Sequence, residues 1–198
     1  MKDINEFRII NEKEIQMITK SLSDLSPKII EILRKSDYKL FISLEYTKKK
    51  NDYPRLFLIH TTSWAPIIRN LDKTVTINSG GIYFGVIKRG NVLISLEGAE
   101  FLYKNGYTSE ERHIYLSEDA EKSILYGNDL LKKNMVEDAE KLPKTFKKNS
   151  LYLVINASSE VISLVKFLVN NSEFQDRKPN ERIAINLIDK GYYLRKKQ

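Results

Sequence analysis

The sequence contains no cysteine, only two histidines and no long apolar segment. Without cysteine, the chain can form no disulfide, no thiolate metal site and no cysteine nucleophile. Two histidines, His60 and His113, are too few for a histidine-rich metal cluster. No stretch approaches the roughly 18 apolar residues of a membrane helix, and the start of the chain shows no signal peptide. We therefore expect no membrane partner and a cytoplasmic location, or a nucleolar one in a eukaryote.

Charge is the clearest compositional signal. Of 198 residues, 33 are Lys or Arg and 26 are Asp or Glu, which gives a net charge of +7. Apolar residues make up 41% of the chain, enough for a folded core. A basic balance favours anionic partners such as nucleic acid.

The charge is unevenly distributed in the second half of the chain. Residues 110–140 hold 4 basic and 9 acidic side chains, whereas residues 141–148 hold 4 lysines and no acid. Residues 177–198 hold 7 basic and 2 acidic side chains. Because phosphate neutralisation supplies much of the affinity for nucleic acid, such segregation suits RNA binding. Lysine-rich loops that are simply solvated are the alternative explanation.

Periodicity predicts helices and strands in the first half. A capping box at Asn11 and Glu14 begins one helix, and Ser26 is the expected N-cap of a second. A short helix over residues 97–103 ends at Asn105-Gly106. Strands are expected at residues 38–46, 55–60, 82–88 and 92–95, with a hairpin turn at residues 89–91, a turn at residues 47–52, a short helix or turn at residues 63–70 and a short strand at residues 74–78.

The second half predicts one helix among short strands. Ser117 is the expected N-cap of a helix that runs to Lys133, with an acidic first turn and a basic end. Strands are expected at residues 112–116, 151–155, 161–169, 182–188 and 192–195. This composition favours a small β-barrel. The polar segment 105–111 separates the two halves, so we expect an α+β protein with domains at residues 1–108 and 109–198.

No arrangement of residues indicates catalysis. The segment Gly80–Gly85 lacks the Lys-Ser/Thr pair of a phosphate-binding loop and is better explained as a tight turn entering a strand. The two histidines have no partner motif and are expected to pack on strands. Capping and helix-dipole effects explain the acidic pair Glu110-Glu111. We therefore expect no catalytic residue, no metal site, no cofactor and no enzymatic activity.

Two segments carry distinctive patterns: residues 117–133 are SEDAEKSILYGNDLLKK, and residues 189–195 are DKGYYLR. Together they resemble the Nip-seven family of factors in large-ribosomal-subunit biogenesis. The first segment resembles the first helix of that family's PUA domain, a module named for pseudouridine synthases and archaeosine transglycosylases, and the second fits its closing pattern D-x-G-x-Y-hydrophobic-Arg. Residues 8–14, 79–85 and 97–102 also fit the family, whereas residues 47–54 and 141–148 do not.

The resemblance implies an N-terminal α/β pre-PUA domain followed by a C-terminal PUA-type β-barrel. It also implies a role in large-subunit maturation and rRNA processing. The RNA partner would be precursor rRNA in single-stranded or U-rich regions, and the protein partners would be ribosome-assembly or RNA-processing proteins. The residues expected to face RNA are Arg177, Lys178, Arg182, Lys190 and Arg195 and, in a second tier, Lys132, Lys133 and Lys166.

Glycines and tyrosines of the matched segments carry further expectations. Gly127 inside the expected helix costs about 1 kcal/mol relative to alanine, so we expect a close backbone approach there. Gly191 suits a turn or bulge into the last strand. One of Tyr192 and Tyr193 is expected to stack on a base, because alternation buries the other. The first-domain cations Lys48, Lys49, Lys50, Lys88 and Arg89 are expected to be solvated turn residues.

Two other functions remain open at this stage. One is a protein-interaction adaptor in ribosome assembly or in an RNA-processing complex. The other is an accessory subunit of an RNA-modification enzyme.

Overall fold

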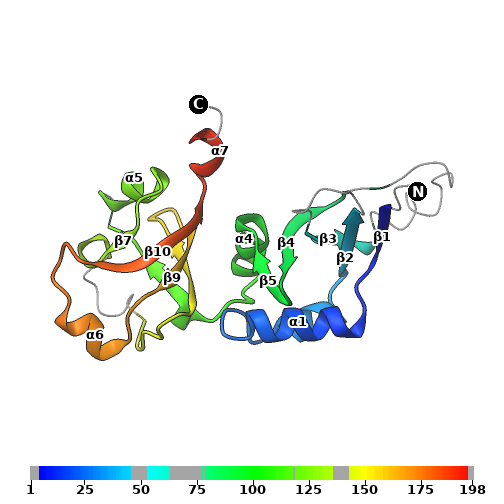
Figure 1. Ribbon diagram of the computed structural model, residues 1–198, viewed down its shortest axis with the longest axis horizontal. Helices are drawn as coiled ribbons and strands as arrows, with labels where there is room; N and C mark the ends of the chain where they lie inside the picture. Colours follow the sequence, from blue (N-terminus) through cyan, green and yellow to red (C-terminus); the bar gives the residue numbers. More distant parts are fainter. Residues whose placement is uncertain are drawn as a thin grey trace. The chain divides into compact units, whose positions relative to one another are not determined.

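The computed structural model describes residues 5–45, 53–62, 77, 79–117, 119–135 and 143–195. The chain divides into two compact units, Met1–Phe101 and Leu102–Gln198, and each unit contains a five-stranded sheet (Figure 1). The predicted boundary between Thr108 and Ser109 lies a few residues later and stays a prediction. The predictions for the turn with Lys48, Lys49 and Lys50, for residues 63–70, for most of residues 74–78 and for Lys141 fall outside the described residues.

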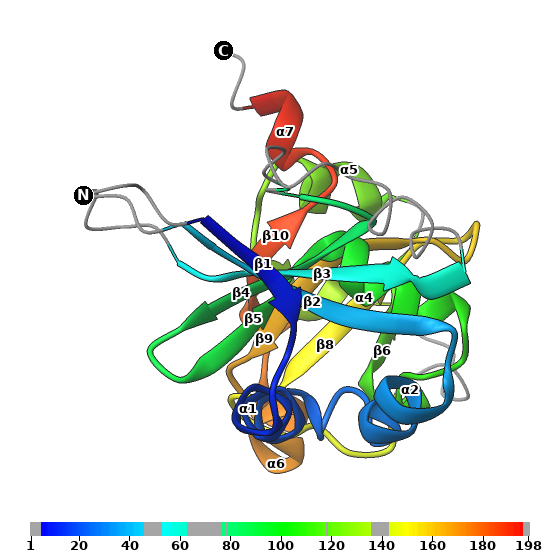
Figure 2. The same cartoon turned by 90° about the vertical axis from the view of Figure 1, so that its right-hand side faces the viewer.

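The sheet of the first unit is antiparallel throughout, with strand order β1-β2-β3-β4-β5. Helix α1 packs against β5 and α2 against β2, and Figure 2 shows both helices on the same side of this sheet. The elements are β1 (Asn5–Ile9), α1 (Glu12–Leu22), α2 (Ile29–Lys35), β2 (Tyr38–Glu45), β3 (Arg55–His60), β4 (Ile82–Lys88), β5 (Asn91–Ile94) and α4 (Leu96–Lys104).

Short-range signals account for most of these boundaries. The capping box of α1 is confirmed: the Asn11 side chain accepts from the Glu14 N–H at 3.0 Å, and the Glu14 carboxylate accepts from the Asn11 N–H at 2.7 Å. The hairpin between β4 and β5 turns at Arg89 (φ 53°) and Gly90 (φ 75°). The predicted N-cap at Ser26 is wrong, because α2 begins at Ile29 after a turn in which the Ser26 N–H bonds the Leu22 carbonyl.

The end of α4 is also local in origin. The Gly106 N–H donates to the Tyr103 carbonyl, and the Tyr107 N–H donates to the Leu102 carbonyl. Gly106 has φ +68°, the left-handed conformation that this helix-ending motif requires. The predicted helix end at Asn105-Gly106 is therefore confirmed.

The sheet of the second unit has strand order β6-β8-β9-β10-β7, and only the β6–β8 pair is parallel. Leu116, just after β6, bridges Met135, which follows β7, so the two edges of the sheet curl toward each other. The elements are η1 (Glu110–Arg112), β6 (His113–Tyr115), α5 (Ala120–Leu125), β7 (Leu130–Leu131), η2 (Lys132–Asn134), β8 (Leu151–Ile155), β9 (Val161–Phe167), α6 (Asn171–Asp176), β10 (Arg182–Asp189) and α7 (Tyr192–Arg195), where η denotes a 3₁₀ helix.

The curled sheet encloses an aromatic core in which a buried arginine is hydrogen-bonded to a tyrosine. Phe146 stacks on Phe167 at 5.0 Å between ring centroids, and the fully buried Tyr152 packs beside them. The buried Arg112 donates to the Tyr152 hydroxyl at 2.6 Å. The hydroxyl in turn accepts from the Lys147 N–H at 2.9 Å, so the tyrosine is both packed and hydrogen-bonded.

Two predictions for the second half are wrong. The helix expected from Ser117 to Lys133 is the short α5, because Gly127 (φ +86°) ends it and the chain then pairs with β10 as β7. Asp119, rather than Ser117, is its N-cap. The strand expected at Tyr192–Arg195 is the helix α7.

Candidate nucleic-acid interface

Five of the predicted RNA-facing residues come together at one end of β10. Backbone hydrogen bonds join η2 to the segment before β10: the Lys132 N–H donates to the Glu181 carbonyl at 3.1 Å, and the Lys133 N–H donates to the Pro179 carbonyl at 2.9 Å. Leu131 is the register partner of Arg182. Segments about fifty positions apart therefore lie side by side. We call Lys132, Lys133, Arg177, Lys178 and Arg182 the basic cluster.

Lys132 makes more contacts within the protein than the other members of the basic cluster. Its ammonium group donates to the carbonyls of Gln175 (3.1 Å) and Arg177 (2.8 Å) and lies 5.0 Å from the centroid of the Phe174 ring. A cation near the C-terminal carbonyls of α6 stabilises that helix, because its charge interacts favourably with the helix dipole. Lys132 therefore holds α6 against η2, and its predicted contact with RNA stays a prediction.

The other four members differ in how far their charge is neutralised. Arg182 pairs with Asp129 at 2.9 Å, and Arg177 lies 3.8 Å from Glu181. Within the described part of the chain, the exposed side chains of Lys133 and Lys178 make no hydrogen bond or ion pair. These two lysines are the most available cations for phosphate. Asp129, one residue of the acidic segment 110–140, therefore lies directly against the basic cluster.

Lys166, Lys190 and Arg195 do not join the basic cluster. Lys166 lies near the end of β9, opposite Leu151 and Ile185. Lys190 and Arg195 follow the far end of β10, where the Lys190 ammonium pairs with Glu160 at 3.3 Å. Their predicted contacts with RNA stay predictions.

Arg195 closes the C-terminal helix onto the end of α5. Its guanidinium donates to both carboxylate oxygens of the buried Asp189, at 2.9 and 2.8 Å, and to the Leu125 carbonyl. The Asp189 carboxylate raises the pKa of Arg195. A Cβ at Gly191 would overlap the Leu125 carbonyl oxygen, and one at Gly127 would lie 2.9 Å from Arg195 Nη2. The close approach predicted for Gly127 is thus present, beyond the helix rather than inside it.

The two segments that carry the family resemblance therefore meet in space. We call Leu125, Gly127, Asp189, Gly191 and Arg195 the C-terminal clamp. Each glycine lies where a side chain would collide with another member, and the arginine joins the two segments with charge-assisted hydrogen bonds. The matched pattern has a structural explanation that does not require RNA.

Asn186 and Asp129 connect α5 to β10 and were missed by the sequence analysis. The Asn186 amide donates to the Ile124 carbonyl at 3.0 Å, and its backbone N–H donates to Asp129 at 3.0 Å. The second Asp129 oxygen holds Arg182. The network thereby orients Arg182, and no local sequence signal marks either residue.

An exposed tyrosine lies close to this network in the chain. Tyr126, three residues before Asp129, is 75% exposed. Tyr192 is half-buried, and the side chain of Tyr193 lies outside the described residues. The sequence analysis singled out only Tyr192 and Tyr193 for stacking and therefore missed Tyr126.

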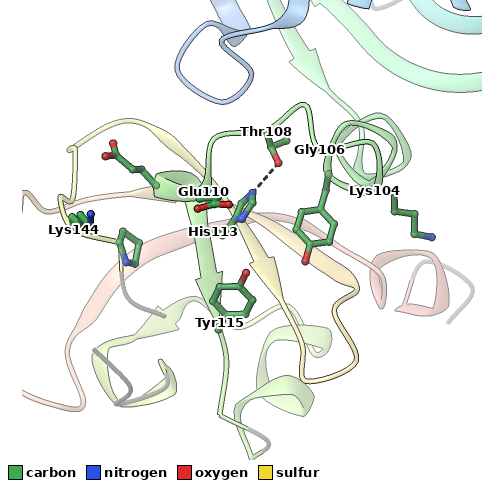
Figure 3. Close-up of a pocket in the computed structure, with 10 residues that line it drawn as sticks. Lys104, Gly106, Thr108, Glu110, His113, Tyr115 and Lys144 are labelled. Carbon is green, nitrogen blue, oxygen red and sulfur yellow. Dashed lines mark hydrogen bonds between the residues drawn. The ribbon is translucent and has the colours of Figure 1, made fainter. Parts of the chain in front are cut away.

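A separate pocket of about 780 Å³ opens at the start of the second unit (Figure 3). His113 forms its buried floor, with Nε2 hydrogen-bonded to Thr108 Oγ1 at 2.8 Å and its ring edge-on to Tyr103 at 5.1 Å. Burial lowers the pKa of His113, and the negative charge of Glu110 partly opposes this. Burial raises the pKa of Tyr115, and Tyr103 and Glu110 raise it further.

The lowered pKa of His113 predicts a loss of stability in acid. The folded protein binds a proton here less readily than the unfolded chain, whose histidine titrates near 6.5. The contribution is complete above that value and is lost as the pH falls through and below it. Urea unfolding at pH 7.5 and 5.5 should therefore show a smaller pH dependence for His113→Gln than for the wild type. An equal pH dependence would contradict this assignment.

The described residues contain no group of three His, Asp or Glu side chains placed to hold a metal ion. Within the same residues, no helix is long and apolar enough to cross a membrane.

Comparisons with known proteins agree with this architecture. Residues 112–198 match the UPF0113 PUA domain family. The fold is similar to that of a conserved PUA domain protein from Thermoplasma acidophilum (TM-score 0.59, 13% identity, 94% of this chain and 95% of that one). It is also similar to that of a PUA-domain structure from Aeropyrum pernix (TM-score 0.59, 12% identity, 95% and 88%).

A hypothetical protein from Pyrococcus horikoshii is similar over 93% of this chain and 94% of its own, with a TM-score of 0.57 and 12% identity. A comparison with curated protein sequences finds no match. The family match and the shared fold lead to one conclusion: this is a PUA-domain protein, and the PUA domain occupies residues 112–198.

Proposed function

We propose that this chain binds single-stranded RNA through the basic cluster of its PUA domain and that it catalyses no reaction. The observation that carries the proposal is the gathering of five basic residues from η2, the end of α6 and the start of β10. PUA domains are RNA-binding modules, which supports the same conclusion. Neutralised phosphates would supply most of the affinity.

Within this proposed interface, different residues would contact phosphates and bases. Lys133 and Lys178 are exposed and offer their charges to phosphate, whereas Arg182 is held by Asp129 in a fixed orientation. Tyr126 offers an exposed aromatic face for an unpaired base. Phosphate contacts of this kind set affinity, and a stacked base adds a preference for unpaired strands.

For the biological RNA, we propose precursor rRNA of the large ribosomal subunit. The support is the resemblance of residues 117–133 and 189–195 to the Nip-seven family. The chain would act as an assembly factor that also contacts ribosome-assembly or RNA-processing proteins. In cells, RNA crosslinked to this chain should be enriched in large-subunit precursors, and enrichment of other RNA classes instead would contradict this assignment.

Fluorescence anisotropy of the full chain with labelled single-stranded and duplex RNA tests the binding proposal. The expected result is preferential binding of single strands, with a log–log salt slope equivalent to several phosphates. The RNA should be recovered unchanged, in keeping with a binding protein. Absence of binding at low salt and micromolar protein would overturn the proposal and favour a protein-interaction adaptor.

A further inference from the structure

The pocket at the start of the second unit shares no residue with the basic cluster or the C-terminal clamp. Its volume of about 780 Å³ falls within the range of roughly 300–1,000 Å³ typical of small-molecule sites. Its lining comes from the end of α4, from η1 and from β6, with Lys144 on a further segment. The proposed RNA interface leaves this pocket without a role.

The walls of the pocket suit a flat aromatic ligand. Tyr103 and His113 meet edge to face, and the half-buried Tyr115 also lines the pocket. Three rings therefore surround the opening, and the ring contact fixes two of them relative to each other. Preorganised aromatic surfaces of this kind bind planar rings such as nucleobases by stacking.

Two carboxylates, Glu110 and Glu111, line the pocket, and Glu110 is the one beside the His113 ring. Glu110 lines the pocket together with His113 and Tyr115, and Figure 3 shows it beside the His113 ring. Among the described residues, its carboxylate makes no hydrogen bond or ion pair. An ionised carboxylate only accepts hydrogen bonds and is best satisfied by two adjacent N–H donors.

Guanine meets this requirement better than the other common bases. Its ring N–H and its 2-amino group lie side by side on one edge, and together they match the two oxygens of a carboxylate. Adenine and cytosine offer one amino group on that edge, and uracil offers one ring N–H. In Figure 3, Lys104 and Lys144 lie on opposite sides of the pocket, where a cation would accompany the phosphate of a nucleotide.

We infer that this pocket binds a guanine base, with Glu110 accepting from its N–H edge and Tyr103 and Tyr115 contacting its ring. The base can come from a free nucleotide or from an unpaired guanosine of RNA. If the ligand is a free nucleotide, the inference is independent of the proposed RNA binding. If the ligand is an RNA guanosine, the inference rests on the proposed RNA binding.

Calorimetric titration of the full chain with GMP, IMP, AMP and UMP tests the chemistry. GMP should bind at least tenfold more tightly than AMP or UMP, and IMP, which lacks the 2-amino group, should fall between them. Glu110→Gln should weaken GMP binding at least tenfold. Glu31→Gln removes the same charge from the exposed first turn of α2 and should leave GMP binding unchanged.

A second arm identifies the source of the base. Short oligonucleotides of uridine, with or without one guanosine, are compared on the wild type and on Glu110→Gln by anisotropy. A guanosine preference that Glu110→Gln removes indicates an RNA guanosine, whereas GMP selectivity without it indicates a free nucleotide. If neither ligand shows a preference that depends on Glu110, the inference is wrong. Retained binding of all-uridine RNA in that case would leave the proposed function intact.

Discussion

Alanine in place of Gly191 is expected to destabilise the second unit by about 3 kcal/mol. The added methyl group would overlap the Leu125 carbonyl oxygen, which is backbone and cannot move aside like the end of a side chain. Relief would require α7 to shift, and the shift would pull Arg195 away from Asp189 and leave a buried carboxylate without its partner. Amide hydrogen exchange of β10 measures the effect, because it reports the free energy of opening of this sheet.

Gly90→Ala is the matched control for Gly191→Ala. Gly90 has a positive φ of 75°, but a Cβ there meets nothing within 4 Å. The expected cost is about 1 kcal/mol, from the left-handed conformation alone, and it should be confined to the first unit. Equal exchange rates in β10 for Gly191→Ala and the wild type would show that the C-terminal clamp is not closed in solution.

The double variant Lys178→Ala with Arg182→Ala is expected to weaken single-stranded RNA binding several-fold. Both residues belong to the basic cluster, and their removal leaves up to two phosphates without a cation. The log–log salt slope should fall by roughly 1 for each phosphate that is no longer neutralised. Arg182 must break its ion pair with Asp129 before it can bind phosphate. Lys178→Ala alone should therefore account for most of the loss of RNA affinity. Anisotropy titrations of the full chain over a series of salt concentrations measure both quantities.

Arg34→Ala with Lys35→Ala provides the matched control for this double variant. These residues are exposed at the end of α2 in the first unit, and the variant removes the same two kinds of side chain. RNA affinity and salt slope should stay close to those of the wild type. If both double variants weaken binding equally, the effect comes from net charge and the basic cluster is not the interface.

The features that could be predicted from the sequence depend on contacts between near neighbours in the chain. The Asn11–Glu14 capping box joins residues three apart, and the turn at Arg89-Gly90 joins adjacent strands. Gly106 ends α4 through hydrogen bonds to residues of the preceding turn. Local runs of β-prone residues also predicted the strands β8, β9 and β10. The family resemblance was likewise recognised in two continuous segments, residues 117–133 and 189–195.

The basic cluster depends on contacts that no local pattern contains. The basic cluster forms because η2 is hydrogen-bonded to a segment about fifty positions away. This contact brings Lys133 and Lys178 together, whereas Lys190 lies beyond the other end of β10 and pairs with Glu160. The pocket is more local, because residues 103–115 supply most of its lining, and only Pro143 and Lys144 come from a distant segment.

The order of most elements and the basic character of the chain follow from the amino-acid sequence alone. Gly127 ends α5 locally, whereas only a tertiary contact decides that the helix Tyr192–Arg195 packs on the end of α5. The end of α5 and helix α7 are hydrogen-bonded to each other, because the Arg195 guanidinium donates both to Asp189 and to the Leu125 carbonyl about seventy residues away. A final extended strand at Tyr192–Arg195 would carry the guanidinium away from the buried Asp189 carboxylate and leave that charge without its partner.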